Sequence, residues 1–343
     1  MLVTIEEVLK MHPNNPLLRW DRLKPKKVLV VGDAMLDYYL WGKATRLSPE
    51  APVPILKMGK GDLCLGGAGN VAFNLKELGC CITLVCGIGP DKDGEILANT
   101  ACELLDKVAA MCVLTETTAK KRIMVSPYGH QLARMDWEDD STCVESKLIW
   151  ARCLEEAIKL HPDAVVISDY DKGMLRSQLG PKLIGYVQEQ DIPIFIGSKD
   201  DSWQRYSGAT CIVANKDETD KVITKASQKH VIAGDRTFIH NHRTLCENLG
   251  IKRLVVTQGS QGAELYGGPD HGSEPTIVPA FPQQVYDVCG AGDTFLAMLV
   301  LARLNGFAWP DATLLANYAA SKVVGKVGTA TVTLHELQES TAQ

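Results

Sequence analysis

The sequence has no hydrophobic run long enough to cross a membrane. A membrane-spanning helix needs about 20 predominantly apolar residues, and no apolar run of this 343-residue chain approaches that length. The N-terminal stretch MLVTIEEVLKMHPNNP also lacks the basic start and the long apolar core of a secretory signal, and it carries acidic residues instead. These absences predict a cytoplasmic protein that has no membrane partner.

An excess of basic residues is missing as well. The chain has 36 Lys and Arg against 41 Asp and Glu, a formal net charge of -5, so a nucleic-acid partner is not expected. The 11 cysteines are an odd number and include no C-x-x-C pair. Most lie in apolar stretches, as Cys86 and Cys211 do, which predicts reduced, buried thiols rather than a disulfide framework.

Several common catalytic and nucleotide-binding signatures are also absent. The chain has no G-x-x-x-x-G-K-[ST] loop, and GGAGN at 66–70 lacks the G-x-G-x-x-G spacing of a dinucleotide fingerprint. No Ser-His-Asp or Cys-His order occurs with its supporting motifs. The HNH tripeptide at 240–242 invites a metal or nuclease interpretation, but its polar, helical surroundings favour exposed histidines.

Apolar strands alternate with helical patterns along most of the chain. Strand-like runs are KKVLVVGD, CITLVCGIG, DAVVISDY, IPIFIG, ATCIVAN and KRLVVTQG; helical ones are GNVAFNLKELG, GEILANTACELL, LIGYVQEQ and segments near 236–249, 292–306 and 311–326. This alternation predicts an α/β fold, with a mostly parallel sheet covered by helices on both faces. We expect one domain over residues 1–343, with ligands beyond the carboxyl ends of the strands.

Two segments break this alternation. Residues 37–57 are rich in proline and aromatics, and residues 120–137 have the pattern of a hairpin with a turn at SPYGH. Both favour extended structure over helix. We predict that they form a small β-lid over the ligand edge of the sheet, where a lid would suit a reaction that must exclude water.

A group of small residues precedes a carboxylate at the start of the long apolar run in VYDVCGAGDTFLAMLVLARL, residues 285–304. Amides at a helix N-terminus lack partners and attract anions, and Gly290, Ala291 and Gly292 leave room for a phosphate to approach them. Asp293 could then accept a proton from a hydroxyl that attacks the phosphate, which predicts a kinase. The alternative is an ordinary turn with a helix cap.

Other polar residues follow the ends of predicted strands. They are Asp33, Asp169, Asn215 with Glu218 three residues on, and Thr257 with Gly259; Asn70 lies near the start of a helix. Each alone is compatible with a cap or a turn. Because a parallel sheet presents the ends of its strands at one edge, the set as a whole favours a ligand site.

Three of these motifs resemble those of the ribokinase-like, or PfkB, carbohydrate kinases. They are GGAGN at 66–70, Asn215-x-x-Glu218 and GAGDTF at 290–295. The segments VVGDAMLDYYLWGKATRLSPEAPVPIL, LGGAGNVAFNL, SDYDKG, YDVCGAGDT and VVGKVGTATV further resemble the branch that phosphorylates D-glycero-D-manno-heptose 7-phosphate at O1, for ADP-heptose and lipopolysaccharide synthesis. The resemblance runs from about residue 25 to 335.

This resemblance implies a ribokinase-like three-layer α/β/α fold and an enzyme that uses ATP and Mg²⁺. It also implies a homodimer formed through the lid. In many bacteria this kinase is fused to a nucleotidyltransferase, and we expect the present chain to be the stand-alone form.

The resemblance also implies roles for individual residues. Asp293 would be the base, and the amides of Gly290, Ala291 and Gly292 would stabilise the transferring phosphoryl group. The sugar-binding set would be Asp33, Asp37, Gly66, Gly67, Asn70 and Asp169. The nucleotide set would be Lys199, Asn215, Glu218, Thr257, Gly259 and Asn317, with Glu218 acting on Mg²⁺ through water and a monovalent cation possible near Asp287.

A substrate that already carries a phosphate needs cations to bind it. The candidates are Arg46, Arg122, Arg134, Lys172 and Lys199. Arg46 and Lys172 are favoured because they lie beside or within the branch-specific stretches SPEAPVP and SDYDKG. The alternative for each is a solvated surface charge.

The chain departs from the family pattern at three positions on the nucleotide side. Ser198 replaces an Asp, Ala214 replaces a Pro, and Cys289 replaces a Ser or Thr. A kinase of another sugar or sugar phosphate therefore stays open, as do the anomer and the nucleotide preference. A non-catalytic sugar-binding protein is the third hypothesis, and the presence of Asp293 argues against it.

Overall fold

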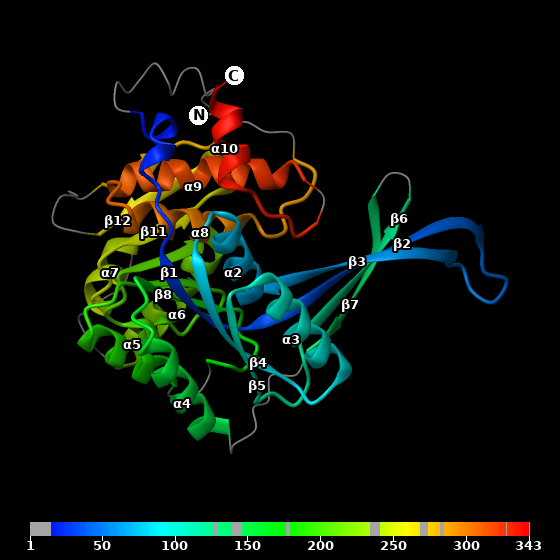
Figure 1. The fold of residues 1–343 in the computed structure, drawn as a ribbon, viewed down its shortest axis with the longest axis horizontal. Coiled ribbons are helices and arrows are strands. Elements are labelled where there is room, and N and C mark those ends of the chain that lie inside the picture. Colours follow the sequence, from blue (N-terminus) through cyan, green and yellow to red (C-terminus); the bar gives the residue numbers. More distant parts are fainter. Residues whose placement is uncertain are drawn as a thin grey trace.

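The computed structural model describes residues 15–126, 129–138, 146–175, 179–233, 241–267, 274–281, 285–326 and 328–342. A nine-stranded sheet with the order β13-β12-β11-β10-β9-β8-β1-β4-β5 forms the centre of this part of the chain (Figure 1). Its strands are β1 (Lys27–Gly32), β4 (Cys81–Ile88), β5 (Lys107–Cys112), β8 (Ala164–Asp169), β9 (Ile194–Ser198), β10 (Cys211–Asn215), β11 (Leu254–Thr257), β12 (Ala263–Tyr266) and β13 (Thr276–Val278). Neighbours from β5 to β11 are parallel, and β12 and β13 are antiparallel.

The sequence explains why β1 and β8 lie at the middle of the sheet. Every residue of β8 is buried, as is all of β1 after its first residue. Parallel strands buried on both faces have continuous runs of Val, Ile and Leu rather than alternating polarity. β8 ends at Asp169 and β1 is directly followed by Asp33, so both place a carboxylate at the carboxyl edge, where the predicted site lies.

Helices cover the sheet in two groups, as the prediction of a three-layer α/β fold requires. The first group is α2 (Ala68–Glu77), α8 (Ala291–Leu304) and α9 (Trp309–Val324), and the second is α4 (Ser146–Ile158), α5 (Leu179–Glu189), α6 (Lys216–Ala233) and α7 (His242–Leu249). Two further helices, α3 (Lys92–Leu104) and α10 (Leu334–Ala342), lie at the periphery. Among the described residues, no helix has both the length and the apolar character needed to span a membrane.

The central helix of the first group is α8. Its residues from Asp293 to Ala302 are all buried, in keeping with a helix that is apolar on every side. It packs against both α2 and α9. The N-terminus of α8, with its carboxylate, is therefore placed inside the molecule rather than at its surface.

Not every helix was predicted. The sequence pattern near 220–233 did not predict α6, because this segment is polar and has a weak apolar stripe. The helix expected near 236–249 is present as α7, which begins after an Asn241 capping box. Residues 236–240 of that prediction lie outside the described residues.

Four strands form a second sheet with the order β3-β2-β6-β7. They are β2 (Ala34–Leu47), β3 (Pro54–Gly67), β6 (Ala119–Val125) and β7 (His130–Trp137), and they project from the body of the molecule (Figure 1). Both segments predicted for the lid are thus extended. The first is longer than 37–57, because β2 starts just after β1 and β3 continues into α2.

The two faces of this second sheet carry different side chains. The parallel register of β2 with β6 places Asp37 beside Lys120 and Tyr39 beside Arg122 on one face. Tyr38 and Lys121 lie on the other face, where the Tyr38 hydroxyl donates to Asp93 at 2.8 Å and the Lys121 ammonium pairs with Asp93 at 3.2 Å. These contacts join the base of the sheet to α3.

Candidate active site

The site is built around Asp293, in the first turn of α8. Its carboxylate is buried, with 8% of the residue exposed. The side-chain amide of Asn70, in the first turn of α2, donates to Oδ2 at 2.7 Å. The hydroxyl of Tyr170, in the loop after β8, donates to Oδ1 at 2.7 Å. Three segments far apart in the sequence therefore meet at one carboxylate.

Burial determines the protonation of Asp293. Loss of hydration raises the pKa of Asp293 to about 6, and the hydrogen bonds from Asn70 and Tyr170 and the charge of Lys199 oppose that rise. The carboxylate is therefore largely ionised at pH 7, yet it is a stronger base than an exposed Asp. A pKa close to the working pH suits a general base.

A second layer of contacts fixes the orientation of Asn70. Its Oδ1 accepts from the Asn74 side-chain amide at 3.0 Å, and Asn74 Oδ1 accepts from the Thr294 hydroxyl at 2.8 Å. Gly290, the N-cap of α8, has φ 80°, and a Cβ atom there would lie 2.9 Å from Asn70 Nδ2. Glycine is required at this position because any side chain would displace the Asn70 amide from Asp293.

The loop that carries Tyr170 is held by Asp33. The Asp33 carboxylate accepts from the backbone amides of Tyr170 at 2.8 Å, Lys172 at 3.1 Å and Met174 at 3.2 Å. Burial and the neighbouring Asp169 carboxylate raise the pKa of Asp33 to about 7. Asp33 is 2% exposed and holds this loop from beneath; its predicted role in binding sugar hydroxyls stays a prediction.

Asp169 has a similar position. It accepts from the Tyr206 hydroxyl, from the Asp171 amide at 2.8 Å and from Arg205 at 3.4 Å, and it is 1% exposed. Like Asp33, it supports the loop from below rather than facing open space. Asp169 directly precedes Tyr170, which donates to Asp293, and Asp33 binds the amide of the same Tyr170. The strand-end pattern thus located both acids near the site but did not predict their hydrogen-bond partners.

The amides at the N-terminus of α8 are only partly available for a ligand. The Ala291 amide donates to the Val288 carbonyl at 3.3 Å. The amides of Gly290, Gly292 and Asp293 have no acceptor among the described residues. Of the three amides predicted to hold a phosphate, those of Gly290 and Gly292 best meet the requirement, and that of Asp293 joins them.

A buried ion pair lies on the lid face nearest the site. Arg122 Nη1 and Asp37 Oδ1 are 2.5 Å apart, and both residues are less than 10% exposed. Asp37 Oδ2 also accepts from the Thr329 hydroxyl at 3.1 Å. A Cβ atom at Gly66 would lie 2.5 Å from Asp37 Oδ2, so this glycine lets the pair approach the start of α2. Gly67 likewise abuts the Asp33 carbonyl.

The cations predicted for a substrate phosphate do not all gather at this place. Lys172 pairs with Glu138 at 2.7 Å, and Arg134, which is exposed, pairs with Asp136 at 2.9 Å. The Lys199 ammonium lies 4.7 Å from the centre of the Tyr170 ring. Arg46 is exposed near the far end of β2, nine residues or roughly 30 Å along the strand from Asp37, and it is not brought to Asp293.

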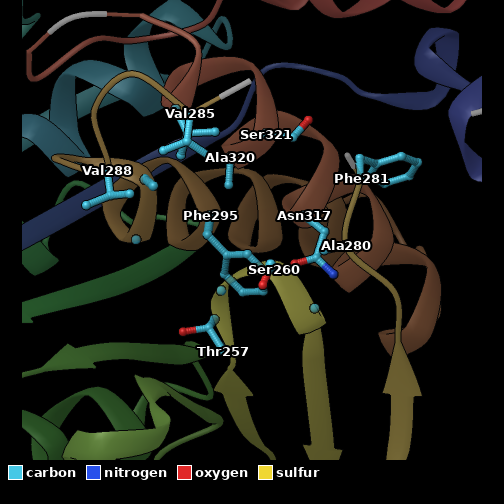
Figure 2. Close-up of a pocket in the computed structure, with 15 residues that line it drawn as sticks. Thr257, Ser260, Ala280, Phe281, Val285, Val288, Phe295, Asn317, Ala320 and Ser321 are labelled. Atoms are coloured by element: carbon cyan, nitrogen blue, oxygen red, sulfur yellow. The ribbon is translucent and has the colours of Figure 1, made fainter. Parts of the chain in front are cut away.

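A cavity of about 360 Å³ adjoins the N-terminus of α8. Its lining includes Thr257, Gly259 and Asn317, three residues predicted for the nucleotide, and also Ala291 and Gly292. Figure 2 shows Phe295 of α8 and Asn317 of α9 beside this cavity, with Val285 and Val288 at another side. A mostly apolar cavity of this size suits a flat aromatic base, and its contact with α8 leads to the free amides.

Asn317 is oriented by the backbone. Its side-chain nitrogen donates to the carbonyls of Val278 at 3.3 Å and Pro279 at 3.0 Å. The Oδ1 atom is then the acceptor that remains for a ligand in the cavity. Such an acceptor matches the exocyclic amino group of adenine and would oppose the carbonyl of guanine.

The other predicted nucleotide residues lie beside the cavity lining rather than in it. The Asn215 amide donates to Glu218 Oε2, and Asn215 Oδ1 accepts from the Glu218 amide, both at 2.8 Å. This reciprocal pair caps α6 and leaves Glu218 Oε1 without a described partner, which fits a water-mediated contact with Mg²⁺.

Asp287 joins two loops. Its Oδ1 accepts from the Cys289 amide at 2.9 Å and its Oδ2 from the Gly328 amide at 3.1 Å. A monovalent cation at Asp287 would have to share these oxygens with backbone donors. No group of three or more His, Cys, Asp or Glu side chains that could hold a metal occurs in the described part of the chain.

Sequence reasoning missed Tyr170 and Lys120 as site residues. Tyr170 directly follows the end of β8, so the rule that located Asp169 could have found it. The position of Lys120 beside Asp37 can be inferred only when the register of β2 and β6 is known. Within the HNH tripeptide, His240 lies outside the described residues, and His242 stacks on Tyr266 with ring centres 4.5 Å apart.

Comparisons with known proteins identify the family of this chain. The family model described as pfkB family carbohydrate kinase matches residues 25–336. The chain belongs to this family. The matched family is one of carbohydrate kinases, and the fold is ribokinase-like, as the sequence predicted.

Among the curated relatives, the bifunctional protein HldE of Magnetococcus marinus is 38% identical over 91% of this kinase and 63% of its own length. The chain spans about 61–64% of the length of the relatives it matches. Among solved structures, phosphofructokinase-2 from Escherichia coli in complex with potassium has a TM-score of 0.71 at 18% identity, covering 93% of this chain and 98% of its own. Arabidopsis thaliana ribokinase complexed with ribose and ATP has a TM-score of 0.64 at 19% identity, covering 93% and 99%.

The raised pKa of Asp293 predicts a pH dependence of both activity and stability. If Asp293 is the base, kcat/KM of the kinase falls as the pH drops below about 6, because the protonated carboxyl cannot accept a proton. The folded-state pKa is above the unfolded value of 3.8, so folding disfavours the ionised form. The resulting penalty develops between pH 4 and 6 and amounts to at most about 3 kcal/mol.

Asp293→Asn should therefore separate the two effects. We expect kcat to fall by about 10²–10⁴-fold, while the melting temperature rises at pH 8 and changes less at pH 4. The Asn side chain can still accept from Asn70 and donate to Tyr170, so no buried group is left unpaired. Calorimetry at the two pH values and steady-state kinetics are the measurements; retention of most turnover would exclude Asp293 as the base.

Proposed function

We propose that this kinase transfers the γ-phosphoryl group of ATP to O1 of D-glycero-D-manno-heptose 7-phosphate, giving the 1,7-bisphosphate. The family membership supports the reaction class, and the branch-specific stretches SPEAPVP and SDYDKG support the sugar. The observation that most supports the proposal is the position of Lys120, which lies half-buried on the lid face beside Asp37 and whose ammonium has no described ion pair.

The proposed chemistry begins with Asp293. Its carboxylate accepts the proton of the sugar hydroxyl as that oxygen attacks the γ-phosphorus, and ADP leaves. The amides of Gly290, Gly292 and Asp293 point to where charge develops on the phosphoryl oxygens, and such donors are each worth about 10²–10³-fold in rate. The adenine would occupy the cavity beside Asn317, whose Oδ1 favours ATP over GTP.

Mg²⁺, when bound, would neutralise charge on the phosphates, and Glu218 would hold it through water. Potassium is a second cation to test. It is present in the phosphofructokinase-2 structure, and Asp287 is the residue proposed to lie near it here. Replacing potassium by choline in the assay tests whether the enzyme uses a monovalent cation. An unchanged kcat would contradict a potassium site near Asp287.

Lys120 is the best placed cation for the substrate's existing phosphate. It lies beside Asp37 in the register of β2 and β6, and it is only partly exposed. Burial lowers the pKa of Lys120, and the charges of Asp37 and Asp136 oppose that effect only in part. The Lys120 ammonium has neither a hydrogen bond nor an ion pair with the described residues. Asp37 is already paired with Arg122, Asp136 with Arg134 and Glu138 with Lys172, so the Lys120 ammonium is the one of these four cations that we propose for an incoming phosphate.

A panel of sugars tests the function. We would incubate the protein with ATP and Mg²⁺ and measure ADP release and product mass for D-glycero-D-manno-heptose 7-phosphate, the unphosphorylated heptose, ribose and fructose 6-phosphate. We expect turnover of the heptose phosphate and a bisphosphate product. Turnover only with another sugar keeps the kinase and rejects the heptose. ATP binding without transfer to any sugar would favour a non-catalytic sugar-binding protein.

Adjacent lysines provide a matched pair of variants. We expect Lys120→Ala to lower kcat/KM for the sugar phosphate by about 10–100-fold, the loss typical of a hydrogen bond to a charged group. Lys121→Ala makes the same chemical change on the opposite face, where the ammonium pairs with Asp93, and it should have little effect. The two variants should behave alike toward the unphosphorylated sugar. An equal loss with both sugars would remove Lys120 from the phosphate site.

We also propose that the lid forms a homodimer. Six of the large apolar side chains exposed in the described residues belong to it: Leu47, Val53, Met58, Leu132, Met135 and Trp137, each at least 38% exposed. Its outer strands β3 and β7 have unpaired edges that a second copy could cover. Light scattering at micromolar concentration should give twice the 37.4 kDa chain mass, and Met135→Lys should weaken the dimer. A monomeric wild type would contradict this proposal.

A further inference from the structure

The two oxygens of Asp293 are held by donors of different kinds. Asn70 donates to Oδ2 and is itself fixed by Asn74, so it belongs to the packed interface of α2 and α8. Tyr170 donates to Oδ1 from a loop that lies at the carboxyl edge of the sheet. The base is thus oriented by one rigid helical contact and one contact from the substrate side.

The position of the Tyr170 hydroxyl is determined by its own loop. The Tyr170 amide donates to Asp33 Oδ2 at 2.8 Å, and two more amides of the loop converge on the same carboxylate. The Lys199 ammonium lies against the Tyr170 ring, and the Lys199 amide donates to the Asp169 carbonyl at 2.8 Å. The backbone of Tyr170 is therefore held by Asp33 and its ring lies against Lys199, while its hydroxyl has one described partner, the base.

We propose that Tyr170 is a positioning residue for the base: its hydrogen bond orients Asp293 Oδ1 so that the remaining lone pair faces the sugar hydroxyl, and it favours the ionised carboxylate. This inference rests on the proposed role of Asp293. A carboxylate oxygen can accept more than one hydrogen bond, so Tyr170 and the sugar can bind Oδ1 together. The hydrogen bond also restricts rotation of the carboxylate, which places the accepting lone pair before the substrate arrives.

Tyr170 does not itself take the proton. Burial and the Asp293 charge raise the pKa of Tyr170 well above its usual value of 10, so its hydroxyl stays protonated as a donor. The sugar O–H proton passes to the Asp293 carboxylate as the O–P bond forms and the bond from the γ-phosphorus to ADP breaks. The proton then leaves the neutral Asp293 carboxyl for solvent, and no other reactant is needed.

Tyr170→Phe tests the role because it removes one oxygen and keeps the ring. A hydrogen bond to the anion stabilises it, so its loss should raise the pKa of Asp293 by about one unit. We expect the acid limb of the kcat/KM profile to move upward by that amount, with a larger loss at pH 6 than at pH 8. A residue that only packs would lower activity equally at both pH values, and that result would overturn the proposal.

The control is Tyr266→Phe. The Tyr266 hydroxyl donates to the Glu264 carboxylate on β12, so this variant also removes a tyrosine–carboxylate hydrogen bond but leaves the base untouched. Its acid limb should coincide with that of the wild type. Melting temperatures of both variants show whether either change has disturbed the fold.

A direct titration separates this proposal from the choice of sugar. Aspartate labelled with ¹³C at Cγ reports the Asp293 carboxyl by NMR without any substrate, and Asp293→Asn identifies its resonance. We expect a midpoint near pH 6 in the wild type and a higher one in Tyr170→Phe. If no sugar on the panel is phosphorylated, the proposed function is contradicted. The titration still tests whether the Tyr170 hydrogen bond stabilises the ionised Asp293 carboxylate. An unchanged midpoint overturns the inference even if activity falls.

Discussion

A carboxylate buried at the start of a central apolar helix is the interaction on which this molecule depends. Burying a charge is unfavourable unless polar partners surround it. Asp293 obtains those partners from Asn70 on α2 and from Tyr170 in the loop after β8. Both segments must therefore reach the N-terminus of α8, which constrains how α2, α8 and the sheet pack. The same burial gives the carboxyl its raised pKa.

Close packing around this carboxylate requires small residues. Gly290 leaves space for the Asn70 amide, and Gly66 and Gly67 let the end of β3 pass against Asp37 and the Asp33 carbonyl. Asp33 then gathers three loop amides beneath Tyr170. The glycines allow backbone segments to approach closely, and the buried acids hold the loop in place. Together they let Asn70 and Tyr170 both reach Asp293.

The two faces of the lid differ because successive side chains of a strand point to opposite faces of the sheet. One face presents Lys120, Asp37 and Arg122, and the other binds α3 through Tyr38 and Lys121. A shift of one residue in the register of β6 would exchange these faces. The Asp37–Arg122 pair is buried and mutually neutral, whereas the partly buried Lys120 ammonium beside it has no described ion pair, which is why we propose it for the substrate's phosphate.

The sequence by itself determined the α/β fold class, the kinase family and the central place of Asp293, because these follow from local patterns: buried strands, helix starts and small residues before a carboxylate. The sequence could not determine which partners each side chain contacts in the folded protein. Asp33 and Asp169 follow strands as ligand-binding residues do, yet they point beneath the loop, and Arg46 lies far along β2. Only the tertiary structure brings Tyr170 to Asp293 and Lys120 to Asp37, because these contacts join residues 83 or more positions apart. A side chain's partners across such separations depend on packing and strand register, which no local pattern specifies.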